Sequence, residues 1–159
     1  MPAIREGDPA PDVTLTFADG TQARLADYRG KRAVVIFFYP KDGTPVCTQE
    51  ACAFRDSHER FLAAGAEVIG VSSDSAASHR AFAARHSLPY PLVADTDGSL
   101  RKALGAPSIL GFVPGRTTYV IDREGIVRKV FTATFASDAH VREALAALGA
   151  AAAPPGAPQ

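Results

Sequence analysis

The residues best suited to do chemistry are two cysteines placed five positions apart. Cys47 and Cys52 lie in the segment Pro40-Lys41-Asp42-Gly43-Thr44-Pro45-Val46-Cys47-Thr48-Gln49-Glu50-Ala51-Cys52, which is predicted to join a buried strand to a helix. Cys47 then falls in the first helical turn, where unpaired backbone N–H groups and the positive end of the helix dipole favour a thiolate over a thiol. The thiolate is the reactive form of cysteine. The segment therefore predicts nucleophilic chemistry at the sulfur of Cys47.

The residues before Cys47 suit the same site. Thr44 lies three positions earlier, where its hydroxyl is expected to donate a hydrogen bond to a substrate oxygen and to accept one from the turn. Pro40 and Pro45 stiffen the turn and help to exclude water. Each of these residues alone is an ordinary turn residue. Their spacing relative to Cys47 is what makes them candidates for the site.

Other roles for the cysteines have less support. From their number alone, two cysteines in 159 residues are expected to be inert, small apolar residues. A structural disulfide is disfavoured because so short a loop restricts the unfolded chain little. The spacing Cys-x4-Cys does not fit a zinc knuckle and the histidines show no paired ligand spacing, so no metal site is expected. The histidines are instead expected to be solvated helix residues: His58, His79, His86 and His140.

The apolar pattern predicts the elements that position this segment. Ala33–Phe38 is continuously apolar, as in a strand buried on both faces. A helix is predicted over Val46–Ala64, with Gly65 at its C-terminus, because apolar residues recur there at roughly helical spacing. The next predicted elements are a strand at Glu67–Ser72, a helix at Ser75–His86 and a short strand at Tyr90–Ala94. This alternation indicates a parallel sheet.

Antiparallel elements are predicted near both ends of the chain. Val13–Phe17 and Thr21–Leu25 form an N-terminal β-hairpin, and Thr117–Ile121 and Ile126–Phe131 form a second hairpin. Asp138–Leu148 is the last predicted helix. The predicted fold class is therefore α/β, with a central mixed sheet flanked by helices, in a single domain over residues 1–148. Residues 149–159, mainly Ala, Pro and Gly, are expected to form a flexible tail.

The composition argues against several classes of function. Lys plus Arg and Asp plus Glu both number 17, so there is no overall basic field to hold nucleic acid. The longest apolar run, Ala33–Tyr39, is far too short to span a membrane. Charges and prolines stand where a secretory signal needs an apolar run, so a cytoplasmic location is expected. In a reducing cytosol, a disulfide between the two cysteines would be transient and catalytic rather than structural.

The pattern Pro40-x-x-x-Thr44-x-x-Cys47 resembles the active-site signature of the peroxiredoxins. The position of Cys52 is similar to that in the bacterioferritin comigratory protein, or Q-type, subgroup. The similarity covers nearly the whole chain except the tail, and its other segments are Gly7-Asp8-Pro9-Ala10-Pro11, Phe37-Phe38-Tyr39-Pro40-Lys41 and Thr118-Tyr119-Val120-Ile121-Asp122. The resemblance implies a thioredoxin-like fold with added N-terminal elements, in agreement with the element order above.

The resemblance also implies a thiol peroxidase cycle. The Cys47 thiolate attacks the O–O bond of hydrogen peroxide or an organic hydroperoxide and becomes a sulfenic acid, which Cys52 resolves as an intramolecular disulfide. Thioredoxin or a glutaredoxin-like protein is the implied reductant. No metal, haem or flavin cofactor is required. Because the resolving cysteine is in the same chain, a monomer is expected.

Family sites of this kind include a distant arginine, and Arg116, just before the predicted strand Thr117–Ile121, is similar to that position. A guanidinium near the sulfur stabilises both the thiolate and the negative charge on the departing oxygen. Glu50 is expected to orient Arg116 through a bidentate contact.

Two other functions remain open from the sequence. A dithiol-disulfide oxidoreductase on the same fold uses Cys-x-x-Cys, whereas two more residues separate the cysteines here. A non-catalytic redox sensor or holdase would use cysteine oxidation only to change its binding to a partner. Peroxide turnover with a recycling reductant distinguishes the enzyme from the sensor, and insulin reduction without peroxide would indicate the oxidoreductase.

Overall fold

The centre of the fold is a five-stranded sheet of order β5-β4-β3-β8-β9. The computed structural model describes residues 4–106, 108–109, 113–114, 116–133 and 137–152. β3, β4 and β5 run parallel, whereas β8 and β9 are each antiparallel to their neighbours. The predicted mixed sheet is therefore confirmed. The strands are β3 (Ala33–Phe38), β4 (Ala66–Ser72), β5 (Leu92–Ala94), β8 (Thr117–Ile121) and β9 (Val127–Thr132).

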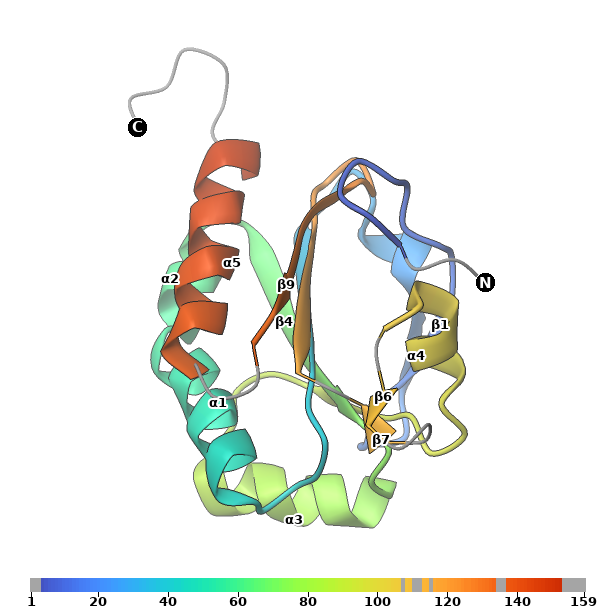
Figure 1. The fold of residues 1–159 in the computed structure, drawn as a ribbon, viewed down its shortest axis with the longest axis vertical. Helices are drawn as coiled ribbons and strands as arrows, with labels where there is room; N and C mark the ends of the chain where they lie inside the picture. The colour runs from blue at the N-terminus through green and yellow to red at the C-terminus, as the bar shows by residue number, and fades with distance from the viewer. Residues whose placement is uncertain (1–3, 107, 110–112, 115, 134–136, 153–159) are drawn as a thin grey trace.

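Helices cover both faces of this sheet (Figure 1). One face packs against α1 (Pro45–Asp56), α2 (His58–Ala63) and α5 (Ser137–Ala152), and α3 (Ala76–His86) lies next to β5. The other face packs against α4 (Ser99–Leu104), the short helix η1 (Leu25–Tyr28) and the hairpin of β1 (Thr14–Thr16) and β2 (Gln22–Arg24). Because both faces are covered, all six residues of β3 are buried, as its continuous apolar run predicts.

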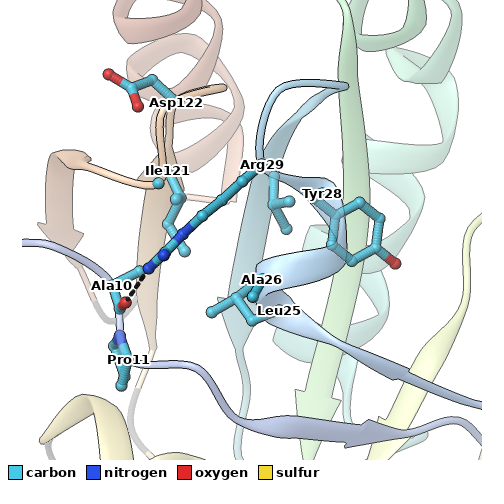
Figure 2. Close-up of a pocket in the computed structure, with 10 residues that line it drawn as sticks. Ala10, Pro11, Leu25, Ala26, Tyr28, Arg29, Ile121 and Asp122 are labelled. Carbon is cyan, nitrogen blue, oxygen red and sulfur yellow. Dashed lines mark hydrogen bonds between the residues drawn. The ribbon is translucent and has the colours of Figure 1, made fainter.

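The N-terminal elements are tied to the sheet by hydrogen bonds. Gly7 N donates to the Val127 carbonyl oxygen at 2.8 Å, and Val127 N donates to that of Asp8 at 2.9 Å. Arg29, just after η1, reaches across a small pocket and donates from Nη2 to the Ala10 carbonyl oxygen at 3.2 Å (Figure 2). The predicted N-terminal hairpin is confirmed.

The single helix predicted over Val46–Ala64 is wrong, because the chain forms two helices that meet at Ser57. Serine is a weak helix former, and Ser57 has φ −103° and ψ 7°, outside the helical region. Its carbonyl oxygen accepts hydrogen bonds from Arg60 N and Phe61 N, which starts the second helix. The break lets α2 pack against β4.

Short elements between β5 and β8 were not predicted: α4, β6 (Ser108–Ile109) and β7 (Val113–Pro114). They are too short to show a periodic apolar pattern. The start of α4 depends on Asp95, whose carboxylate accepts hydrogen bonds from Leu100 N at 2.9 Å and Arg101 N at 3.0 Å.

The C-terminal helix is longer than predicted. α5 continues through Gly149 to Ala152, whereas the predicted helix ended at Leu148. Alanine has the highest helix propensity, so the alanine-rich sequence favours continuation of the helix past Leu148. The rest of the predicted tail, 153–159, lies outside the described residues. Within the part of the chain that the structure describes, no helix is both long and apolar enough to cross a membrane.

Candidate active site

Cys47 lies in the first turn of α1, just beyond the end of β3. The chain leaves the sheet after Tyr39, turns over residues 40–44 and enters α1 at Pro45. Proline is favoured at a helix start because it lacks the N–H group that would otherwise need a partner. Cys47 is 0% exposed and its thiol is free. Its sulfur therefore lies near the positive end of the helix dipole, in a site shielded from water.

The strand register brings Arg116 to this sulfur. β3 and β8 are antiparallel and pair Phe38 with Thr117, so Arg116 precedes β8 at the edge where β3 ends and α1 begins. Its Nη2 donates to Cys47 Sγ at 3.0 Å. The Arg116 side chain is only 9% exposed, so water screens its charge little. The contact places a positive charge and a hydrogen-bond donor against the sulfur.

Glu50 lies one helical turn after Cys47 and faces the same guanidinium. Its Oε1 is 3.4 Å from Arg116 Nη1. Its Oε2 accepts no hydrogen bond from the described residues and lies 3.5 Å from His140 Nε2. The predicted bidentate contact is therefore wrong: one Glu50 oxygen reaches the guanidinium, because Nη2 is directed to Cys47.

Burial raises the pKa of Glu50 to about 8, although the charge and the hydrogen bond of Arg116 act in the opposite direction. A carboxyl group with this pKa is mainly protonated at neutral pH. Glu50 then neutralises little of the charge of Arg116. The positive charge remains available to the sulfur of Cys47.

His140 is part of the shell around this site and was not predicted there. It lies on α5, is fully buried, and packs edge-on against Phe131. Its Nδ1 is 2.7 Å from Thr118 Oγ1, and its Nε2 is 2.8 Å from the Ala133 carbonyl oxygen. Burial lowers the pKa of His140, and the charge of Arg116 adds to this effect while the hydrogen bond to Ala133 opposes it.

The prediction that the histidines are solvated is wrong for two of them. His79 and His140 are both 0% exposed, whereas His58 and His86 are half-buried. A signal was available for His140, because it stands beside Val141 and four residues before Ala144, on the side of α5 that packs inward.

Thr44 and Pro40 shape the turn. The Thr44 hydroxyl donates to the Lys41 carbonyl oxygen at 3.0 Å, and it does not cap the first turn of α1 among the described residues. The Thr44 carbonyl oxygen accepts from Thr48 N at 2.8 Å. Pro40 and Thr44 are both half-buried. Thr44 therefore connects the turn to the first turn of α1, which carries Cys47.

A model described as the AhpC/TSA family matches residues 6–130. The chain belongs to the AhpC/TSA family. A chloroplastic peroxiredoxin Q from Suaeda salsa is 48% identical over 143 residues, which are 89% of this chain and 66% of that protein. One from Arabidopsis thaliana is 48% identical over 149 residues, 93% of this chain and 68% of that protein. This family member thus spans about two thirds of the length of these curated relatives.

Solved structures of the AhpC/TSA family share the fold. The structure of peroxidoxin BcpB from Mycobacterium tuberculosis is 37% identical, with a TM-score of 0.85 over 92% of this chain and 97% of that one. Peroxiredoxin Q from Xanthomonas campestris is 34% identical, with a TM-score of 0.82 over 95% of this chain and 99% of that one. The predicted resemblance to the Q-type peroxiredoxins and the predicted thioredoxin-like fold are both confirmed.

The second cysteine of this AhpC/TSA family member is on the same helix. Cys52 is half-buried, has a free thiol, and lies five positions after Cys47 in α1. The residue before it, Ala51, accepts a hydrogen bond at its carbonyl oxygen from Tyr90 OH at 2.6 Å. Burial raises the pKa of Tyr90 well above its usual value, so this phenol stays a hydrogen-bond donor. The tyrosine thus holds α1 between the two cysteines.

Proposed function

We propose that this chain is a thiol-dependent peroxidase that uses Cys47 as its nucleophile. The observation that carries the proposal is the 3.0 Å contact between Arg116 Nη2 and Cys47 Sγ, in the first turn of a helix. The helix dipole and the guanidinium act on one buried sulfur, and both favour a thiolate. The relatives named peroxiredoxin Q support the same activity.

In the proposed reaction, the Cys47 thiolate attacks one oxygen of hydrogen peroxide or an organic hydroperoxide. An S–O bond forms while the O–O bond breaks, and the departing oxygen takes a proton and leaves as water or an alcohol. Sulfur is oxidised to a sulfenic acid and the peroxide is reduced. Arg116 stabilises the thiolate before the attack and the charge on the departing oxygen during it.

The remaining predicted site residues have supporting roles in this proposal. Thr44 turns its hydroxyl from Lys41 to the peroxide oxygen when substrate binds, since a hydroxyl rotates readily between acceptors. Pro40 limits the flexibility of the turn and the entry of water. Glu50 orients Arg116 through its single contact without removing much of its charge.

Cys52 is the proposed resolving residue. Its thiol condenses with the sulfenic acid of Cys47, which releases water and forms an intramolecular disulfide. Thioredoxin or a glutaredoxin-like protein then reduces the disulfide and restores both thiols. We propose further that the chain acts as a monomer of one domain over residues 1–148 and in the cytoplasm. The two curated relatives described above are chloroplastic proteins.

The proposal is tested by NADPH consumption coupled through thioredoxin reductase and thioredoxin, with hydrogen peroxide and a bulky hydroperoxide measured side by side. The wild-type chain is expected to turn over at least one of them. Cys47→Ser is expected to be inactive because a serine hydroxyl stays protonated and is a far weaker nucleophile. Substantial turnover by this variant would show that Cys47 is not the nucleophile.

A further inference from the structure

A buried polar cluster holds the turn that precedes α1. Asp42 lies in the middle of this turn, and His79 comes from α3 and is 0% exposed. The Nδ1 atom of His79 is 2.7 Å from Asp42 Oδ2. Its Nε2 atom is 2.9 Å from the carbonyl oxygen of Val93 in β5. The imidazole thus joins the active-site turn to the sheet.

Asp42 is fixed by several further hydrogen bonds. Its Oδ1 accepts from Tyr39 OH at 2.6 Å, and its Oδ2 accepts from Ser78 Oγ at 2.9 Å. Its backbone N–H donates to Asp74 Oδ2 at 2.8 Å. Burial raises the pKa of Asp42, but the hydrogen bonds from His79, Tyr39 and Ser78 and the charge of His79 outweigh burial, and the pKa lies below its usual value. Asp42 is therefore a carboxylate.

Both ring nitrogens of His79 face atoms that carry no proton. The Val93 carbonyl oxygen can only accept, so Nε2 must donate. The Asp42 carboxylate can only accept, so Nδ1 must donate as well. In a neutral ring one nitrogen carries no proton. That nitrogen would face another acceptor in a buried site, either Asp42 Oδ2 at 2.7 Å or the Val93 carbonyl oxygen at 2.9 Å, which is costly. A ring that donates from both nitrogens is an imidazolium.

Further polar and charged groups surround the ring. The carboxylates of Asp42 and Asp74 and the ring of His79 place their ligating atoms within 4.8 Å of one another. Tyr39 OH is 3.4 Å from His79 Nδ1. Burial and the nearby Asp42 raise the pKa of Tyr39, so this phenol stays neutral. A cavity beside the ring is also lined by two residues of opposite charge, Asp19 and Arg80.

We propose that His79, as a buried imidazolium paired with Asp42, is a positioning residue for Cys47; this rests on the peroxidase function proposed above. Asp42 and Thr44 belong to the same turn, and the Thr44 carbonyl oxygen accepts the amide of Thr48 in α1. Holding Asp42 in place therefore fixes the start of the helix that carries Cys47. His79 acts through the turn and not on the sulfur.

The charge of His79 is tested by NMR of protein labelled with ¹⁵N-histidine. One ring, identified by the loss of its signals in His79→Asn or in His79→Gln, is expected to have both nitrogens protonated at neutral pH. A ring with one bare nitrogen at pH 7 would overturn the proposal. This measurement does not depend on peroxide turnover. A failure of the peroxidase assay can therefore be distinguished from a failure of this proposal.

The positioning role is tested by stopped-flow rates of Cys47 oxidation in two variants. His79→Asn places an amide donor near the position of Nδ1 and keeps the contact with Asp42, whereas His79→Gln places it near Nε2 and loses that contact. We expect the rate to fall by about tenfold or more in His79→Gln and by less in His79→Asn, because a small displacement of a reacting group is costly. His86→Gln, on the same helix, is the control and is expected to react at the wild-type rate.

Two kinetic results would overturn the proposal. Equal loss of rate in His79→Asn and His79→Gln, matched by equal loss of thermal stability, would show that His79 only fills the core. Rates within about twofold of wild type, which correspond to a change below 0.5 kcal/mol in the activation free energy, would show that the turn does not depend on His79. If His79→Gln does not fold, the protonation state of the wild-type ring still decides the charge, and His79→Asn still decides the role.

The same three ligating side chains raise the alternative of a metal centre. Elemental analysis of the purified protein, with and without added zinc, is expected to show no stoichiometric metal that depends on His79. One equivalent of zinc that is lost in His79→Gln would overturn the proposal, because a nitrogen bound to a metal carries no proton.

Discussion

Formation of a disulfide between Cys47 and Cys52 is expected to unwind the start of α1. Both cysteines lie within the helix Pro45–Asp56. With a rise of about 1.5 Å and a turn of about 100° per residue, at a radius of about 2.3 Å, positions five apart have Cα atoms roughly 8.6 Å apart. A disulfide rarely spans more than about 7 Å between Cα atoms. An intact α1 therefore cannot close the bond.

The contacts of α1 indicate which end yields. Its second half is held by the hydrogen bond from Tyr90 OH to the Ala51 carbonyl oxygen and by the stacking of Phe54 on Phe37, with ring centroids 4.3 Å apart. Among the described residues, no side chain caps its start. Unwinding residues 45–48 breaks about four helical hydrogen bonds, those donated by the amides of Thr48–Ala51, at roughly 1 kcal/mol each. An opening that costs roughly 4 kcal/mol slows amide exchange about a thousandfold in the reduced protein.

Hydrogen exchange measured by mass spectrometry checks this expectation. After one equivalent of peroxide, exchange in Thr48–Ala51 is expected to accelerate by up to about a thousandfold, because the disulfide holds the segment open. Cys52→Ser, treated in the same way, cannot form the bond and is expected to change much less. Unchanged exchange after verified disulfide formation, or an oxidised structure that keeps the whole helix, would refute the reasoning.

Three substitutions test the site further. Cys52→Ser is expected to keep the oxidation of Cys47 but to stop the thioredoxin-linked cycle, with oxygen atoms added to Cys47 in mass spectra; full turnover would exclude Cys52 as the resolving residue. Arg116→Lys is expected to slow Cys47 oxidation at least about tenfold, because an ammonium lacks the planar fork that contacts both sulfur and peroxide; an unchanged stopped-flow rate would contradict this role. Burial raises the pKa of Glu50 from 4.5 to about 8, so its contribution to stability is complete below pH 4.5 and is lost as pH rises through 8. In denaturant unfolding, the stability of Glu50→Gln relative to wild type should therefore rise from pH 5 to pH 9, on the order of a few kcal/mol. The same stability difference between the two proteins at pH 5 and at pH 9 would argue against the raised pKa.

Local sequence determined the parts of this protein that depend on near neighbours. The apolar run Ala33–Phe38 specifies a strand buried on both faces, and the helix predicted from Val46 begins within one residue of the observed start at Pro45. These features were predicted because strand burial and helix initiation are decided within a few residues. The same local reasoning failed at Ser57, where the packing of α2 against β4 outweighs a helical pattern that continues through the break.

Tertiary structure alone decided which side chains meet. Arg116 reaches Cys47 because β3 pairs with β8 in one register, and a shift by one residue would point it to the other face of the sheet. The pattern of α3 does not show that His79 is fully buried, because the partners that satisfy its nitrogens come from other elements. Hydrogen bonds and charges between distant segments exist only after the chain has folded, which is why short-range patterns in the sequence could not specify them.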